Sequence, residues 1–168
     1  MRDQIFEARS AMPVSAEQLF AWHASAGAFE KLIPPWQRVE LLRPPQGLRD
    51  GDRVLLRVRL CPGVWKLWEA EHFGVIEGRR FCDRQLRGPF GRWEHTHDFV
   101  PRGEHACELV DRVAYRAPFG VLGRLAQPFL RRELARLFAH RHAATRAHLE
   151  AELAAGAGAG FGAASNAR

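Results

Sequence analysis

The stretch Phe81–Phe99 constrains the fold more than any other part of the chain, because its alternating pattern predicts two paired strands with one chemically mixed face. A turn at Gly88–Gly91 separates the strands. On the second strand, one face carries Trp93, His95, His97 and Phe99. On the first strand, one face carries Phe81, Asp83 and Gln85. Faces that mix aromatic rings with imidazole, carboxylate and amide groups are typical of a cavity wall that receives a small molecule.

The pattern on either side of this stretch predicts an α+β fold. The expected strands are 4–12, 36–42, 53–60, 64–75, the pair within 81–99, and 107–116; the expected helices are 16–24, 28–33 and 121–153. Pro128 predicts a kink or a broken first turn in the last helix. An antiparallel sheet of about six to seven strands must bury one face, and the last helix is the element large enough to cover it. A curved sheet wrapped around that helix would leave a cavity between the two.

Alternation does not decide which face of strand 64–75 points inward. One face carries Trp68, Ala70 and His72, and the other carries bulky aromatic and acidic residues. Both faces contain groups that a cavity wall could use. The orientation of this strand therefore stays open at the level of the sequence.

The length of 168 residues fits one domain, which we expect to span 1–153, followed by a Gly/Ala-rich segment, 154–168, that we expect to be disordered. The three cysteines, Cys61, Cys82 and Cys107, have no metal-site or disulfide spacing. No apolar run is long enough to span a membrane, and the N-terminus lacks the apolar segment of a signal peptide. We therefore expect a cytoplasmic protein without stable membrane insertion.

The formal charge of +6 comes mostly from arginine, since Lys31 and Lys66 are the only lysines. The arginines are spread through strands and the last helix rather than gathered in one basic run, so we expect no nucleic-acid partner. The face carrying Arg131, Arg132 and Arg136 could meet anionic lipid or RNA, with a steep salt dependence. A plainly solvated helix face is the interpretation we favour.

Several short motifs resemble one bacterial branch of the SRPBCC superfamily, the START and pollen-allergen-like helix-grip proteins. The motifs are Leu32-Ile33-Pro34-Pro35-Trp36, Trp68-x-Ala70-x-His72, the whole Phe81–Phe99 stretch, Asp111-x-Val113-x-Tyr115 and Phe138-x-x-Arg141-His142. Domains of this branch often precede a short-chain epimerase-like domain, in fused proteins known as cell-division inhibitors. This chain has no glycine-rich dinucleotide motif, so the resemblance implies a possible epimerase-type partner enzyme but no nucleotide-dependent activity.

The resemblance implies a helix-grip fold and an internal cavity for a small hydrophobic or amphipathic molecule, such as a lipid, quinone or polyketide. Combined with the alternation, it identifies a set of candidate ligand-binding residues. These are Trp36, Leu56, Val58, Trp68, His72, Phe81, Gln85, Trp93, Phe99, Asp111, Tyr115, Phe138, Arg141 and His142. The sequence leaves open whether the chain is a monomer or a homodimer.

His95 and His97 form an H-x-H pair whose imidazoles point the same way on a strand. With a carboxylate from Asp83 or Asp111, or a third imidazole from His72, such a pair could hold zinc or iron. We favour a hydrogen-bonding or proton-shuttling role instead, and we expect no metal and no cofactor. A structural pair remains open, as does a plain hydrogen bond between Asp111 and Tyr115.

Two functions follow from these patterns. The favoured one is a carrier or sequestering module that binds a small apolar ligand in the cavity. The alternative is a cyclase- or dehydratase-like enzyme that uses His95 or His97 with Asp83 for acid–base chemistry beside a carbonyl group. Replacing His95 should abolish turnover in the enzyme but not ligand affinity, whereas a carrier has no turnover to lose.

Overall fold

The computed structural model of the chain describes residues 3–118, 123 and 125–162. Within these residues a single sheet of seven strands runs in the order β1-β7-β6-β5-β4-β3-β2, and its neighbouring strands are all antiparallel. The strands are β1 (Gln4–Met12), β2 (Val39–Arg43), β3 (Arg53–Cys61), β4 (Val64–Ile76), β5 (Arg80–Arg87), β6 (Arg92–Gly103) and β7 (Ala106–Arg116). The helices are α1 (Ala16–Ala24), α2 (Ala28–Lys31) and α4 (Gln127–Gly162).

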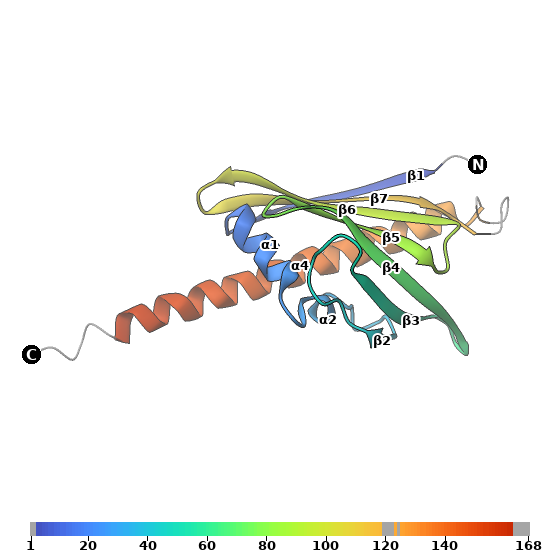
Figure 1. The fold of residues 1–168 in the computed structure, drawn as a ribbon, viewed down its shortest axis with the longest axis horizontal. Coiled ribbons are helices and arrows are strands. Elements are labelled where there is room, and N and C mark those ends of the chain that lie inside the picture. The colour runs from blue at the N-terminus through green and yellow to red at the C-terminus, as the bar shows by residue number, and fades with distance from the viewer. Residues whose placement is uncertain (1–2, 119–122, 124, 163–168) are drawn as a thin grey trace, which may run out of the picture.

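The long helix α4 crosses beneath the sheet, and α1 and α2 lie on the same side of the sheet (Figure 1). The strands β2, β3 and β4 bend away from the β1-β7-β6 part of the sheet, which gives the sheet its curvature. The C-terminal part of α4 extends beyond the strands. The predicted α+β arrangement, a curved antiparallel sheet around a long C-terminal helix, is therefore confirmed.

The sequence also predicted the start of α1 correctly. Ser15 forms a capping box with Gln18: the Ser15 hydroxyl accepts from the Gln18 backbone N–H, and the Gln18 side chain accepts from the Ser15 backbone N–H. These bonds satisfy two backbone groups that the first turn of a helix leaves free. The helix then packs its inner face, including Leu19 and Phe20, into the core.

The predicted strand 36–42 begins too early. The Gln37 backbone N–H donates to the Pro34 carbonyl at 3.0 Å, which closes a turn around Trp36. Pairing with β3 starts only at Val39. The strand expected to end at Phe99 also runs further, because β6 continues to Gly103 and the chain reverses at 104–105.

The last helix can be compared with the prediction at both of its ends. Gly123 and Leu125 are helical, but the turn residue Ala126 separates them from α4, so the predicted helix is broken just before Pro128. Pro128 itself lies in the first turn of α4, where a missing N–H leaves no bond unmade. The helix then continues to Gly162, past the predicted end at Leu153. The predicted start near Val121 and the final residues 163–168 lie outside the described residues.

Buried apolar side chains form two separate clusters between the sheet and the helices. The first joins α1 to one end of the sheet through Leu19, Phe20, Phe81, Phe99 and Leu149, with further residues around them. The second lies toward the other end of the strands and contains Phe6, Trp93, Val113, Tyr115, Leu134 and Phe138. We call these the α1-side cluster and the hairpin-side cluster.

Ion pairs cover the outer face of the sheet and account for much of the arginine content. Glu71 accepts from both Arg53 and Arg84, and Arg112 binds Glu7 through two nitrogens. Because each pair joins neighbouring strands, the arginines on this face are largely matched by carboxylates. No helix in the described part of the chain is both long and apolar enough to cross a membrane.

Candidate functional site

Two cross-strand rows bring the polar residues of the sheet together. In the first row His72 of β4 lies opposite Asp83 of β5, which lies opposite His95 of β6. In the second row Phe81 lies opposite His97, which lies opposite Asp111 of β7. Directly paired residues point to the same face, so strand register alone gathers these side chains on the inner face of the sheet. The open orientation of β4 is thereby settled, since Ala70 and His72 are buried.

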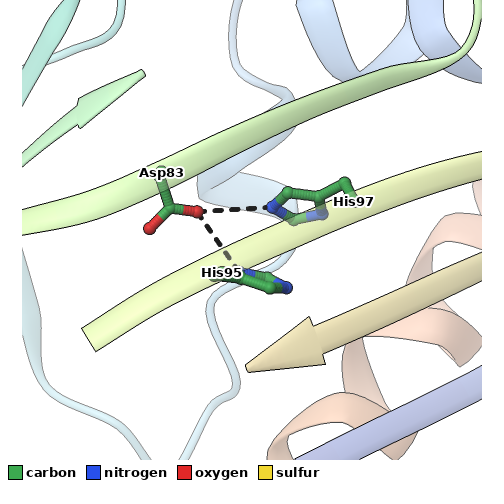
Figure 2. A group of neighbouring side chains, drawn as sticks. All are labelled: Asp83, His95 and His97. Carbon is green, nitrogen blue, oxygen red and sulfur yellow. Dashed lines mark ion pairs between the residues drawn. The ribbon is translucent and has the colours of Figure 1, made fainter. Parts of the chain in front are cut away.

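Asp83 faces both histidines of the H-x-H pair (Figure 2). Its Oδ2 atom lies 3.2 Å from His95 Nδ1 and 3.5 Å from His97 Nε2. The two imidazole rings are themselves close, with centroids 3.8 Å apart. The His97 ring also stacks on Phe81 at 4.0 Å. These contacts restrict the orientation of both imidazoles.

Asp111 faces the same two histidines from the other side. Its Oδ1 atom lies 3.0 Å from His95 Nε2 and 2.7 Å from His97 Nδ1, although the His97 contact is not aligned as a regular hydrogen bond. Its Oδ2 atom lies 2.6 Å from Nε2 of His142 on α4. Both Asp111 oxygens therefore face imidazoles, so the alternative in which Asp111 pairs with Tyr115 is not what the structure contains.

His142 connects this cluster to β1. Its Nδ1 atom lies 2.8 Å from the hydroxyl oxygen of Ser10. On β1 the small residue Ala8 lies opposite Asp111, which leaves room for a side chain from α4 to reach the carboxylate. Sequence reasoning explained Ser10 as a turn or cap residue, but it lies within β1, and nothing in its local pattern could have indicated this contact. The contact depends on how α4 packs on β1.

The carboxylates and imidazoles of this cluster shift one another's pKa. Burial alone would lower the pKa of His95, but hydrogen bonds with Asp111 and Asp83 outweigh it and raise that pKa to about 9. Burial would raise the pKa of Asp83, yet hydrogen bonds with His95 and His97 lower it. The pKa of Asp111 is lowered well below its usual range by His97, His142 and His95 against the opposing effect of burial. The two carboxylates thus favour the protonated form of His95.

The cluster forms a polar belt between the two apolar clusters. We define the belt as Asp83, His95, His97, Asp111 and His142. On β6 it separates Trp93 in the hairpin-side cluster from Phe99 in the α1-side cluster. On α4, His142 lies between Phe138 and Leu149 in the same way. Charges buried this deeply need mutual pairing, which the belt supplies.

Three polar atoms beside the belt are buried and have no hydrogen-bond partner among the described residues. They are Arg141 Nε, His72 Nδ1 and His97 Nδ1. Burial lowers the pKa of Arg141, although Asp111 and Asp83 oppose the shift. The Arg141 guanidinium also lies 5.6 Å from the centre of the Phe138 ring. Unpartnered buried donors of this kind are uncommon in folded proteins and suit a polar guest.

His23 of α1 is a further titratable residue that sequence reasoning left without a polar role. Its Nδ1 lies 2.9 Å from the Leu19 carbonyl oxygen. Because a carbonyl can only accept, Nδ1 carries the proton and Nε2 carries the free lone pair. Its ring centroid is 6.1 Å from that of His97. Burial, followed by the proximity of His97, lowers the pKa of His23 to about 4. A neutral imidazole therefore lies close to the charged belt.

The aromatic candidates fall into two groups. Trp68, Phe90 and Trp93 form one group, in which the Trp68 ring lies 5.2 Å from Trp93 and 5.7 Å from Phe90. The Trp93 ring also lies near the His95 ring, with the two ring centroids 6.3 Å apart. Trp36 is different: it is 39% exposed and contacts Arg136 and His140 on the outside of α4. Trp36 is therefore not part of the interior.

The remaining candidates have mainly packing or turn roles. Phe138, Tyr115 and Phe99 are fully buried in the apolar clusters, Leu56 is buried opposite Trp68, and Val58 is half-buried farther along β3. Gln85 uses its side-chain amide locally: Nε2 donates to the Phe90 carbonyl at 2.8 Å, and Oε1 accepts from the Phe90 N–H. Because both ends of this amide are engaged, we no longer count Gln85 among the ligand contacts.

The best-formed hollows of the described surface lie away from the belt. One, of about 370 Å³, is lined by residues that include Ile76, Arg79 and Phe99. The other, of about 620 Å³, is lined by residues that include Glu17, Phe20 and Gly78. Both are open to solvent rather than enclosed. Neither hollow is lined by a belt residue, and the half-buried rings of Trp68 and Phe90 lie at the edge of the interior.

A curved sheet around a terminal helix with a polar interior defines a helix-grip protein of the START-like class. A family model described as polyketide cyclase / dehydrase and lipid transport matches residues 12–140, and the chain belongs to that family. No curated protein matches the chain.

Solved structures share the fold at low sequence identity. The Zhui aromatase/cyclase from Streptomyces sp. R1128 has a TM-score of 0.72 at 16% identity, covering 90% of this chain and 96% of its own. A START superfamily protein from Mycobacterium smegmatis has a TM-score of 0.63 at 17% identity, covering 87% and 97%. A nucleoside-diphosphate sugar epimerase from Corynebacterium glutamicum matches with a TM-score of 0.64 at 23% identity, over 86% of this chain but 29% of its own. The last match agrees with the predicted resemblance to an epimerase-fused domain.

Proposed function

We propose that the chain binds a small amphipathic molecule between the sheet and α4. The observation that carries this proposal is the pair of unpartnered buried polar atoms, on Arg141 and His72, beside an aromatic wall. A polar or anionic head group would complete their hydrogen bonds, and the guanidinium of Arg141 would favour a negative charge. The apolar part of the molecule would lie against Trp68, Phe90 and Trp93.

Family membership supports this proposal, since the family description includes lipid transport. The packing also supports it, because the half-buried rings of Trp68 and Phe90 stand where the interior meets solvent. Their displacement would open space without disturbing the fully buried Phe138 and Tyr115. Ligand binding and ring movement would then be coupled.

Native mass spectrometry of the protein purified from the cells that make it, followed by denaturing extraction, tests the proposal. We expect an organic mass that is retained in the native state and released on denaturation. Replacing Arg141 by Met keeps an unbranched apolar stem but removes the guanidinium and its charge, and should weaken retention by about tenfold or more, or roughly 1.4 kcal/mol. Arg132→Met is the matched control, because Arg132 is exposed on the same helix and its loss changes net charge equally.

The proposal fails if the native mass is bare and the protein also fails to bind an anionic amphipathic dye such as anilinonaphthalene sulfonate. It also fails if Arg141→Met and Arg132→Met retain the ligand equally. In either case the unpartnered atoms would be features of packing alone.

A second candidate function is acid–base catalysis in the same interior. The specific observation is that two imidazoles are shifted in opposite directions: the pKa of His95 is raised to about 9 and that of His23 is lowered to about 4. Opposite shifts of this kind create a proton donor and a neutral proton acceptor in one site. A cyclisation or dehydration beside a carbonyl group needs both. Chemical turnover of the retained molecule that disappears in His23→Gln, while binding persists, would favour this candidate; unchanged turnover would exclude it.

A further inference from the structure

Three donor atoms from two neighbouring strands converge at one place in the belt. They belong to Asp83 on β5 and to His95 and His97 on β6, and one donor atom of each lies within 4.8 Å of the others. Figure 2 shows both imidazoles directed toward a single oxygen of Asp83. We propose that these three residues form a binding site for a divalent transition-metal ion, and that the ion is zinc. This proposal does not depend on the identity of the amphipathic ligand.

The spacing of the donors distinguishes this triangle from ordinary ion pairs. Charged N–H···O bonds are typically about 2.7–2.9 Å long. Asp83 Oδ2 lies farther away than that, 3.2 Å from His95 Nδ1 and 3.5 Å from His97 Nε2. Zinc–ligand bonds of about 2.0–2.1 Å at tetrahedral angles would hold neighbouring donors roughly 3.3 Å apart. The two separations from Asp83 lie on either side of that value, so these two edges of the triangle match a tetrahedral zinc ion.

The surroundings of the triangle have the form that supports metal-binding histidines. A ligating imidazole usually directs its second nitrogen to a carboxylate or carbonyl that fixes the ring. Here the second nitrogens of His95 and His97 lie 3.0 and 2.7 Å from the same Asp111 oxygen. The other Asp111 oxygen is bound by His142, which in turn contacts Ser10. Asp111 would therefore hold both ligands in position without touching the ion.

The donor set selects among metals. Two imidazoles and one carboxylate suit zinc or iron rather than calcium or magnesium, which prefer oxygen ligands. With bonds of the same length, octahedral angles would bring donors to roughly 2.9 Å from one another, closer than the distances found here. Tetrahedral zinc with three protein ligands keeps its fourth position open. Asp83 is 18% exposed, which leaves the carboxylate edge of the triangle accessible to an entering ion.

The competing explanation is that the three residues are only an ion-paired part of the belt. In that case the protein would have no specific affinity for zinc beyond that of exposed histidines. Calorimetric titration of ZnCl₂ into metal-free protein separates the two explanations. We expect one Zn²⁺ per chain, an affinity at least about 100-fold weaker in Asp83→Asn and His97→Ala, and wild-type affinity in His105→Ala. His105 is an exposed histidine in the turn between β6 and β7 and serves as the matched control.

Asp111→Asn provides a test of the supporting role. This variant keeps all three proposed ligands and should weaken zinc binding by about 10- to 100-fold. Thermal unfolding of the metal-free variants checks that they fold. Asp83→Asn preserves side-chain shape at a partly exposed position. If His97→Ala does not fold, the zinc affinity of Asp83→Asn decides the test.

Cobalt(II) provides a second measurement on the wild-type protein alone. Bound in a tetrahedral nitrogen and oxygen site, Co²⁺ gives intense visible absorption bands, whereas octahedral Co²⁺ gives weak ones. We expect intense bands that saturate at one equivalent and vanish on addition of zinc. Weak octahedral bands, the absence of a 1:1 zinc complex, or equal zinc affinity in folded Asp83→Asn would each overturn the proposal.

Discussion

Asp111 divides its two oxygens among three imidazoles that come from a strand and a helix. Only 4% of its side chain is exposed, so water cannot replace a lost partner. Removing one member of a buried charged pair typically costs about 3–5 kcal/mol, because the remaining charge stays desolvated. Removing this carboxylate should therefore destabilise the protein about as much as truncating a large buried apolar side chain.

At the same scale, His23 should make the stability of the fold sensitive to acid. Its pKa is lowered to about 4 in the folded protein from an ordinary value of 6.5, so between these values the unfolded chain binds a proton that the folded chain does not. The contribution of His23 is complete above pH 6.5 and is lost as the pH falls toward 4. Its slope is at most about 1.4 kcal/mol per pH unit.

Urea unfolding at pH 6.5 and pH 5 would measure this effect. Wild-type protein should lose up to about 2 kcal/mol more over that interval than His23→Leu, which cannot bind the proton. His105→Leu should behave as the wild type, since His105 is exposed. Parallel pH profiles for wild type and His23→Leu would show that His23 is not held neutral by burial.

Sequence reasoning anticipated most of the belt, for a simple reason. Strand alternation placed Asp83, His95 and His97 on inner faces, because that periodicity is local. For the same residues the sequence favoured a hydrogen-bonding role over a metal site, since the distances between strands on which a metal site depends cannot be read from the pattern. His142 was predicted only through the family resemblance. The polar contacts of Ser10 and His23 were missed, because they arise only when helices pack on the sheet.

Among the elements, the hairpin between β5 and β6 depends on one side-chain lock. Gln85 bonds to both backbone groups of Phe90, and Gly88 lies directly against the Gln85 side chain. A Cβ atom on residue 88 would collide with that side chain. We therefore expect Gln85→Ala and Gly88→Ala each to destabilise the protein by about 1–2 kcal/mol.

A double-mutant cycle distinguishes a shared mechanism from two separate ones. If both substitutions act by breaking the same lock, the double variant should lose little more than either single variant. Denaturant unfolding of the four proteins gives the coupling. Fully additive losses would mean that Gly88 is required for a reason other than the Gln85 side chain.

The elements themselves were largely predictable, and the errors have local causes. Long alternating strands such as β3 and β4 were placed within about a residue or two, because burial on one face imposes a regular pattern. The start of β2 was wrong, since a proline-rich turn can carry apolar residues such as Trp36 without pairing. The predicted end of α4 at Leu153 was too early, because the alanines that follow favour helix although the glycines between them do not.

For the whole molecule, the projecting end of α4 should contribute little to stability. Leu149 is buried, whereas residues 151–155 are all exposed. A chain ending after residue 155 should therefore unfold within about 0.5 kcal/mol of the wild-type value, as is usual for changes at exposed positions. Thermal and urea unfolding would check this, with a chain ending after Arg146 as the control that also removes Leu149. A large loss of stability in the chain that ends after residue 155 would mean that the segment beyond it packs on the domain.

The polar belt also fixes the position of the long helix along the sheet. A helix held only by apolar side chains could shift along the sheet by one turn, about 5.4 Å, and still bury an apolar stripe. Here such a shift would carry His142 away from Asp111 and break the contact that partners this buried carboxylate. The helix therefore has one favoured axial position, and a guest that loosens the aromatic wall can do so without changing how the two halves of the molecule are aligned.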